Sequence, residues 1–468
     1  MPSFSRHRSR GVTLSAVVAG VTLLAVGCGR SSSSSPGGGT TSAATSASAT
    51  ASASTSANAI GKGDFGSEKK VCASGPATGA SGRGIVGKTI HLGVLADPGA
   101  AAAPGLEQEF FDTADAFTKW CNAAGGINGY QLVVDKLDAK LFNGGQQVIQ
   151  ACQKDFMLVG GGNALDATDV KPRLACKLGQ IPAYTVSPEA SSAGLQVSPS
   201  ASFPTKYPVG SLRLLALAFP DTQQALGIAG SNLASLTPQG LRAQQAYQEL
   251  GYKVTTVQPR PALVDNYRPW IEQMKQTGAK ADFEITAQDP TPIFNAMNDT
   301  GFKPEWTLFA QTFYSSKSIA AAKSVPFLPN SYVAFSNLPW ELADQFPVVA
   351  QAKAIMQDAV PTSNLNAFTD GAFNAWVLWA ESATACGSTL TQDCILQKAA
   401  QHPAWTAGGL YPPVNTDPTV QTPTNCIVIM HLTKNDGFVY DKKVTQPNNS
   451  VYNCGANNIV TVKSFQTS

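Results

Sequence analysis

The strongest constraint on the fold is an alternation of strand and helix patterns that runs along the chain twice. In the first series, buried-strand runs alternate with helical spacings, as at Thr89–Ala96 followed by Glu107–Ala124. A second series of similar length begins at Ala225–Ala229 and continues to Trp306–Phe309. This alternation favours parallel sheets with helices on both faces, so the predicted fold class is α/β with two doubly wound parallel-sheet lobes.

The segments around and after these series suggest how the lobes are joined. Val209–Phe219 has the pattern of a helix that carries the chain from the first lobe to the second. Asn366–Ala385 is predicted to be a long apolar helix, and its aromatic residues are interpreted as core packing. Near the C-terminus, Cys426–Leu432 and Phe438–Val444 are β-like runs separated by Asp436-Gly437, a strong hairpin signal.

These patterns divide the chain into segments with approximate boundaries. Because a single core stops growing near about 250–300 residues, the part of the chain beyond its N-terminal leader is expected to form two lobes. We predict a signal peptide, a tether, a first lobe with C-terminal return segments, and a second lobe, at residues 1–27, 28–70, 71–208 with 337–468, and 209–336 respectively.

The N-terminal residues are typical of export. Arg6, Arg8 and Arg10 precede an uncharged stretch from Gly11 to Gly27, which is the pattern of a signal peptide. Ala25-Val26-Gly27-Cys28 resembles a bacterial lipobox, with Ala25 where leucine is usual, and this resemblance implies cleavage before Cys28 and its lipidation. An ordinary secretory signal or a retained membrane helix are the alternatives. The Ser/Thr/Ala/Gly-rich residues that follow are expected to be a flexible tether to an extracytoplasmic body.

Charge and motifs exclude several functional classes. Without the three arginines of the signal, 30 basic residues face 31 acidic ones, so nucleic-acid binding has no electrostatic support. No C-x-x-C occurs and the four histidines are scattered, so neither a metal nor another cofactor is predicted. An enzyme is not expected, because G-x-S-x-G and H-E-x-x-H are absent and the only S-x-x-K match that we single out, at Ser67–Lys70, adjoins the tether.

The chemistry is expected at the carboxyl ends of the strands, where open α/β sheets bind ligands. The predicted ligand-binding residues in the first lobe are Asp97, Gly162, Asn163, Ala164, Tyr184 and Thr185. Those in the second lobe are Asn232, Gln288, Asp289, Gln311, Thr312 and Tyr314.

Gly160–Asn163 suggests the most specific mechanism. Glycines allow a backbone to approach a ligand, and a helix beginning near Asp166 directs free N–H groups toward a carboxylate or similar anion. Asp166 and Asp169 weigh against this, because they add negative charge to the first turn of the same helix. A loop that only turns a corner is the alternative, and Tyr184 and Tyr314 are each nearly as well explained by packing as by contact with an apolar or sugar-like part of a ligand.

Several segments together resemble a known family. They are Ile90–Ala96, Trp120–Tyr130 with its Asn-Ala-Ala-Gly-Gly-Ile-Asn-Gly run, Phe156–Asn163 and Ile181–Thr185. Their order and spacing are similar to those of branched-chain-amino-acid-binding (Leu/Ile/Val-binding) extracellular receptors of the type I periplasmic-binding-protein fold. The resemblance covers the first lobe well and the second lobe, from Ala225 to Phe313, in pattern only.

The resemblance implies a function and a cysteine pairing. It implies two lobes joined by three crossing strands that close on a small-molecule solute, as a monomeric capture component of an ABC importer with a membrane permease as partner. The ligand is then an amino acid or a related amide or carboxylate. A sensor or surface interaction module of the same fold, or a secreted hydrolase, are the alternatives. Eight cysteines beside Cys28 favour four disulfides, and the implied fold pairs them as Cys72–Cys121, Cys152–Cys176, Cys386–Cys394 and Cys426–Cys454.

Overall fold

The computed structural model describes residues 61–200, 203–233, 236–261, 264, 266–285, 289–420 and 422–463. The predicted signal peptide, the predicted lipidation site Cys28 and most of the predicted tether therefore lie outside the described residues. Among the described residues, no helix combines the length and the apolar character needed to cross a lipid bilayer.

The first sheet is built as the strand patterns predict. Its parallel strands lie in the order β3, β2, β4, β5, and a short β1 pairs antiparallel with β2. The strands are β1 (Ile85–Val86), β2 (Thr89–Ala96), β3 (Gln131–Asp138), β4 (Met157–Val159) and β5 (Gln180–Ile181). Along β2, Leu92 and Val94 face the core that holds α1 (Gln108–Ala124), and Leu95 faces the core beside α2 (Gly144–Lys154). Because both faces are covered, β2 is an almost continuous apolar run.

The glycine segment after α1 has the turn function expected from its sequence. Gly125 ends α1 with φ 115°, and its N–H donates to Asn122 O, while the Gly126 N–H donates to Cys121 O. Asn128 and Gly129 then take positive φ in the turn that leads to β3. These residues serve the helix stop and the turn, as expected from the sequence.

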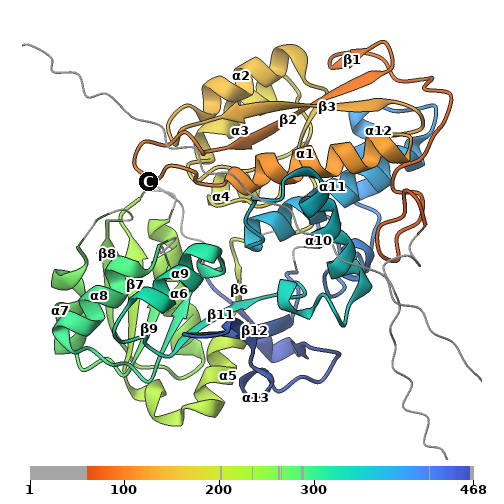
Figure 1. Ribbon diagram of the computed structural model, residues 1–468. Coiled ribbons are helices and arrows are strands. Elements are labelled where there is room, and N and C mark those ends of the chain that lie inside the picture. The colour runs from red at the N-terminus through yellow and green to blue at the C-terminus, as the bar shows by residue number, and fades with distance from the viewer. Residues whose placement is uncertain are drawn as a thin grey trace, which may run out of the picture. The chain divides into compact units, whose positions relative to one another are not determined.

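Helices from the C-terminal third complete the first lobe. Figure 1 shows α11 (Ala367–Cys386) and α10 (Pro347–Ala359) beside α1, and both pack against it. Asn366 begins α11 with a capping box, accepting hydrogen bonds from the N–H groups of Phe368 and Thr369. Trp376 of α11 is fully buried and stacks on Phe117 at 5.4 Å, so the interpretation of this helix as core is confirmed.

The predicted tether ends earlier than residue 70. Phe65 is fully buried and stacks on Phe373 of α11 with ring centroids 5.7 Å apart. The adjacent Gly66 N–H donates to Gln351 Oε1 at 2.8 Å. Residues 61–70 therefore belong to the folded body, and the expectation of a tether across 28–70 was wrong for this part. A single aromatic residue in a polar, glycine-rich stretch has no periodicity that would have revealed it.

The second sheet has eight strands. Five are parallel, in the order β8, β7, β9, β10, β11; β12 and β13 continue it antiparallel, and β14 pairs with β12. The strands are β7 (Leu226–Ser231), β8 (Val254–Arg260), β9 (Ala281–Glu284), β10 (Trp306–Phe309), β11 (Ser331–Phe335), β12 (Cys426–Thr433), β13 (Gly437–Tyr440) and β14 (Asn453–Cys454). The hairpin of β12 and β13 confirms the Asp-Gly turn.

This hairpin corrects the assignment of residues 337–468 to the first lobe. β12 pairs antiparallel with β11 through five residue pairs, from Ser331–Leu432 to Phe335–Val428. The C-terminal strands therefore extend the second sheet, while α10 and α11 belong to the first lobe. A hairpin pattern predicts the pairing within the hairpin, but it carries no information about which sheet edge the hairpin joins.

The remaining elements cover the sheets and connect them. α5 and α6 pack on one face of the second sheet, and the other face holds a core that includes Met274 of α7 and Phe294 of α8. These and the other elements are α3 (Ala167–Ala175), α4 (Pro188–Ser191), β6 (Lys206–Pro208), α5 (Gly210–Ala218), α6 (Thr237–Glu249), α7 (Arg268–Gln276), α8 (Thr291–Thr300), α9 (Ser316–Ser324), α12 (Gln392–Ala399), α13 (Lys442–Thr445) and β15 (Ile459–Thr461).

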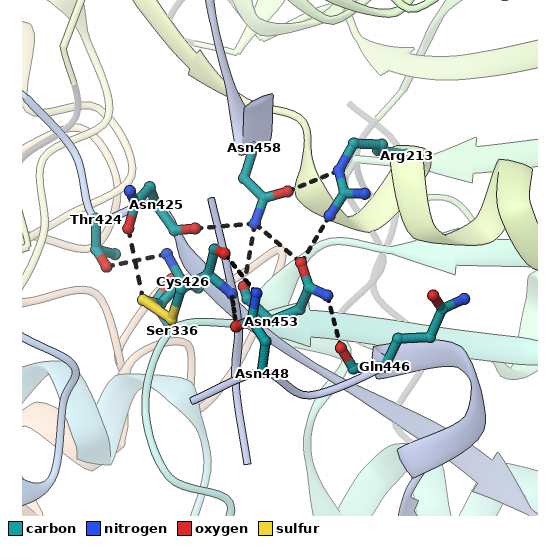
Figure 2. Close-up of a disulfide and its surroundings, with 10 residues drawn as sticks. Arg213, Ser336, Thr424, Asn425, Cys426, Gln446, Asn448, Asn453 and Asn458 are labelled. Atoms are coloured by element: carbon teal, nitrogen blue, oxygen red, sulfur yellow. Dashed lines mark hydrogen bonds between the residues drawn. A yellow bond between two sulfur atoms is a disulfide. The ribbon is translucent and has the colours of Figure 1, made fainter. Parts of the chain in front are cut away.

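The chain passes between the two sheets three times, before α5, after β11 and before β12. A polar network beside a disulfide ties these segments together. Figure 2 shows the Arg213 guanidinium of α5 donating to the Asn458 side chain at 2.9 Å and to the Asn453 side chain at 2.6 Å. The Asn458 amide in turn donates to Asn425 O at 2.9 Å, just before β12. Ser336, after β11, donates to Cys426 O at 2.9 Å. We call these residues the crossover network.

Four disulfides join the cysteines in the pairing that the resemblance implied. They are Cys72–Cys121, Cys152–Cys176, Cys386–Cys394 and Cys426–Cys454. The last one joins β12 to β14 inside the crossover network, and the third joins α11 to α12.

Removal of the disulfide in the crossover network should cost more stability than removal of the one between α11 and α12. The two bonds close loops with sequence separations of 28 and 8 residues. Loop-closure entropy then predicts losses of about 3–4 and about 2–3 kcal/mol for the paired cysteine-to-serine variants. Urea unfolding of both double variants under oxidising conditions measures this, and an equal or reversed order would contradict it.

Candidate functional site

Asp97, at the carboxyl end of β2, holds two strand-end loops of the first lobe together. Its side chain is fully buried. One carboxylate oxygen accepts the Leu141 N–H from the β3–α2 loop at 2.6 Å, and the other accepts the Ala164 N–H from the β4–α3 loop at 2.9 Å. Burial raises the pKa of the Asp97 carboxyl, and the two N–H donors oppose that rise. Asp97 therefore positions the two loops, and the Ala164 N–H donates its hydrogen bond to the Asp97 carboxylate.

The glycines after β4 are required by packing inside the protein. Gly160 has φ 67°, and a Cβ there would lie 2.2 Å from Nε1 of Trp376. A Cβ on Gly161 would lie 2.4 Å from Leu95 O, and one on Gly162 would lie 2.8 Å from the Tyr184 ring. Each glycine thus has a neighbour that excludes a side chain, which differs from the expected role of letting the backbone approach a ligand.

Asn163 is the polar residue of this loop that protein groups do not fully satisfy. Its side chain is 1 % exposed, and neither amide atom completes a well-aligned hydrogen bond with a described residue, although the amide lies beside the Asp169 carboxyl group. A small, partly open pocket of about 20 Å³ adjoins it and is also lined by Gly162, Asp169, Tyr184 and Thr185. That volume holds about one water molecule. A buried amide without well-aligned partners is costly, so this position is suited to receive hydrogen bonds from a ligand.

Carboxyl groups surround the start of α3. Asp166 accepts the N–H groups of Val186 at 2.7 Å and Ser187 at 2.9 Å. Burial raises the pKa of Asp166 to about 6, and burial together with the Asp166 charge raises the pKa of Asp169 to about 7. With Asp97 beside them, these groups disfavour an anion at this helix N-terminus. The arrangement thus speaks against the expected carboxylate contact and favours a neutral or hydrogen-donating group.

Tyr184 and Thr185, after β5, already have partners in the first lobe. The Tyr184 hydroxyl donates to the Glu107 carboxylate, and its ring packs on Phe110 and Phe368 at 5.4 and 5.7 Å. The Thr185 hydroxyl lies 3.1 Å from the Ser191 hydroxyl. Glu107 is a residue that the sequence reasoning missed. It is 2 % exposed, its second carboxylate oxygen has no partner among the described residues, and burial raises its pKa well above the usual value.

The expected residues of the second lobe do not form one cluster of contacts. Asn232 is exposed after β7, and Asp289 is exposed and accepts the Thr291 N–H at the start of α8. Gln311 is exposed and Thr312 is half-buried after β10, whereas Gln288 lies outside the described residues.

The expectation that Tyr314 lines the ligand site is corrected by its surroundings. The residue is 2 % exposed, its hydroxyl donates to the Glu341 carboxylate, and the same hydroxyl accepts the Trp340 N–H at 3.0 Å. Its ring packs on Phe335 and Phe438 in the core. All of its interactions are therefore with protein groups, which is the packing alternative considered for tyrosines.

A buried ion pair in the second lobe also escaped the sequence reasoning. Arg260 ends β8 and donates to the carboxylate of Glu284, which ends β9, and both side chains are buried. Asp282 is fully buried beside them, and burial together with the Glu284 charge raises its pKa well above normal. The signal available in the sequence was a charged residue at the end of each of two strands, Arg260 and Glu284. Among the described residues, no group of three His, Cys, Asp or Glu side chains is placed to hold a metal ion.

The sequence of the chain was compared with models of protein families. The model of the periplasmic binding proteins matches residues 89–437, which is most of the chain. The chain belongs to the periplasmic binding protein family. No curated protein matched this periplasmic binding protein in sequence.

Solved structures share the fold at low identity. A fatty acid ABC transporter substrate-binding protein from Thermomonospora curvata has a TM-score of 0.63 and 14 % identity, over 85 % of this chain and 97 % of that one. A branched-chain amino acid transporter substrate-binding protein from Streptococcus pneumoniae, in complex with isoleucine, has 0.60 and 14 %, over 75 and 100 %. A solute-binding protein from Rhodopseudomonas palustris, in complex with 3,4-dihydroxybenzoic acid, has 0.60 and 12 %, over 81 and 99 %. The α/β type I fold predicted from the sequence is therefore confirmed.

Asp97→Asn should destabilise this periplasmic binding protein by about 1–3 kcal/mol. The amide has one acceptor oxygen, so one of the two backbone N–H groups at 2.6 and 2.9 Å loses its partner and faces an NH₂. Denaturant unfolding at neutral pH measures the loss. Asp289→Asn is the matched control, because asparagine keeps a side-chain oxygen that can accept the Thr291 N–H at this exposed position, and the change should stay within about 0.5 kcal/mol. Equal effects of the two changes would contradict the role of Asp97.

Stability should fall as the pH rises from about 4 to about 7. The folded protein holds protons on Asp166 and Asp169 up to about pH 6 and 7, well above the usual value of 3.8. The unfolded chain releases them earlier, so each deprotonation on the way up favours unfolding, by at most about 1.4 kcal/mol per pH unit and group. Denaturant midpoints between pH 4 and 8 measure the slope. Asp169→Asn should flatten it, and an unchanged slope in that variant would contradict the assignment.

Proposed function

We propose that this chain is an extracytoplasmic solute-binding lipoprotein that captures a small polar ligand, an amino acid or related amide or carboxylate, for an ABC importer. The ligand binds at the carboxyl ends of the strands, with Asn163 as the central contact of the first lobe. The partner is a membrane permease, and Cys28 carries the lipid.

The unsatisfied amide of Asn163 is the observation that carries this proposal. It offers one acceptor and two donors at the strand end where α/β sheets bind ligands, and none of them completes a well-aligned hydrogen bond with a described residue. The family and the solved structures support a solute as the partner, because the related proteins are named as binders of fatty acids, leucine, isoleucine and an aromatic acid.

Two further features support the proposal, one for an extracytoplasmic location and one for ligand contacts from the second lobe. Four disulfides are typical of proteins that fold outside the cytoplasm. On the second lobe, Asn232, Gln311 and Thr312 keep exposed or half-exposed side chains at strand ends, where we expect them to meet the ligand from the other side. Gln288 and Asp289 are proposed as additional contacts at the end of β9.

A thermal-shift screen of amino acids, small amides, sugars and carboxylates tests the proposal. A bound solute at 100 times its dissociation constant should add about 2.7 kcal/mol to the free energy of unfolding. No turnover of the bound solute is expected. Stabilisation by no solute in the screen, or hydrolysis of the solute that binds, would contradict a transport function.

Asn163→Leu should separate binding from folding. In the ligand-free protein the amide makes no well-aligned hydrogen bond with described residues, so an apolar side chain of similar size should leave stability unchanged or slightly higher. The affinity for the solute found in the screen should fall at least tenfold, measured by calorimetry. Asn122→Leu is the control. It loses the two hydrogen bonds to Leu132, so it should reduce stability and leave affinity intact. Equal affinity of Asn163→Leu and the parent protein would place the site elsewhere.

A further inference from the structure

The β2–α1 loop of the first lobe is exposed and yet lacks polar side chains. Residues 99–106 read Gly-Ala-Ala-Ala-Ala-Pro-Gly-Leu, so eight consecutive residues carry neither charge nor a hydrogen-bonding side chain. Ala101, Ala102 and Pro104 are exposed, and Leu106 is half-buried. Surface loops are usually rich in polar turn residues, so an apolar exposed loop at the carboxyl end of a strand is an unusual feature.

Phe142 adds a large aromatic side chain to the same edge. It lies in the β3–α2 loop and is 79 % exposed, the highest exposure of any large apolar residue that the structure describes. Two consecutive non-glycine residues before it, Lys140 and Leu141, have φ of 49° and 71°. Such left-handed residues cost about 1 kcal/mol or more each, so the surrounding structure must hold the loop in this form.

The two loops leave neighbouring strands at the same edge of the first sheet, and we call residues 99–106 together with Phe142 the apolar rim. β2 and β3 pair through Ala96 and Asp138 at the base of both loops. The Gly99 N–H donates to the Asp138 carboxylate at 3.1 Å, and the Leu141 N–H donates to Asp97 at 2.6 Å. Phe142 follows Leu141 directly, so the bond to Asp97 sets where the aromatic side chain leaves the loop.

The apolar rim adjoins the ligand contact proposed on Asn163. The Asp97 carboxylate that holds Leu141 also holds the Ala164 N–H, the residue after Asn163. Two residues after Phe142, a Cβ on Gly144 would lie 2.8 Å from the Asn163 amide nitrogen. The apolar rim and the Asn163 amide therefore lie at one edge of the first sheet. At Gly144 the β3–α2 and β4–α3 loops approach so closely that a single added carbon atom would collide with the amide.

We propose that the apolar rim covers the hydrocarbon part of the solute, so that the ligand is an amphiphile with an amide-like or hydrogen-donating head and an alkyl or aryl body. This inference rests on the proposed function and narrows its ligand class. The head binds at Asn163, where the neighbouring carboxyl groups disfavour an anion. The body lies against Phe142 and the β2–α1 loop. Sugars and short polar solutes lack the apolar surface that this arrangement removes from water.

Two homologous series of ligands test the proposal on the intact protein. One series is the primary amides from acetamide to hexanamide with phenylacetamide, and the other is the matching carboxylates from acetate to hexanoate with phenylacetate. Affinity should rise with chain length, by up to about fourfold for each methylene that becomes buried. At equal length the amide should bind more tightly than the carboxylate.

Phe142 variants assign the effect to the apolar rim. Phe142→Ala should weaken hexanamide and phenylacetamide about tenfold and leave acetamide unchanged, whereas Phe142→Leu should restore most of the loss. Leu217→Ala on α5 is the matched control, since Leu217 is 59 % exposed and lies outside the apolar rim. Because both side chains are largely exposed, the melting temperatures of the ligand-free variants should stay close to that of the parent.

The outcomes separate this inference from the proposed function. Binding of amino acids, sugars or short amides with no gain from a longer body would overturn the inference and leave solute binding intact. Unchanged affinities in Phe142→Ala, with reduced uptake in cells that carry the importer, would assign the apolar rim to the permease and also overturn it. Stabilisation by no member of either series, or of the solute screen, would overturn both.

Discussion

One buried carboxylate organises the edge of the first sheet at which its strands have their carboxyl ends. Asp97 accepts a backbone N–H from the loop after β3 and another from the loop after β4, and its oxygens lie 2.6 and 2.9 Å from the two nitrogens. Backbone groups buried at strand ends need partners, and a charged acceptor serves two of them at once. The positions of Leu141, Ala164 and therefore of Asn163 and Phe142 all depend on this side chain. Its observed role is to hold the two loops in fixed positions relative to each other.

The elements of the fold could be predicted because their patterns are local. β2 and α1 were found from an apolar run and a helical spacing, and the stop at Gly125 follows from glycine's access to positive φ. The disulfides were predicted through the resemblance to a family, since spacing alone allows many pairings. Phe65 and the β12–β11 pairing could not be predicted, because a single buried ring and a choice of sheet edge depend on partners far away in the sequence.

The candidate site was harder to predict than the fold for a physical reason. The rule that α/β sheets bind ligands at the carboxyl ends of their strands selects Asp97, Asn163 and Tyr184, but it does not distinguish a side chain that faces a ligand from one that faces the protein. The hydroxyl groups of Tyr314 and Tyr184 each donate to a carboxylate, so neither hydroxyl hydrogen is left free to bond a solute. Asn163 differs from them in lacking such a well-aligned partner. Whether a polar atom is satisfied depends on tertiary neighbours, which no local pattern contains.

The way in which the N-terminal segment enters the body has a mechanical consequence. Phe65 is inserted against Phe373 of α11, and Cys72 is bonded covalently to Cys121 of α1, so the entry segment is fastened to the two central helices of the first lobe. A tension applied through the preceding residues would therefore reach this lobe first, through the buried Phe65 ring and the covalent Cys72–Cys121 bond. One continuous apolar core extends from these helices into the second lobe, and Gln239 of α6 donates to Val186 O at 3.2 Å. A load applied at the N-terminal end would thus be passed to the second lobe through packed side chains as well as through the crossover network.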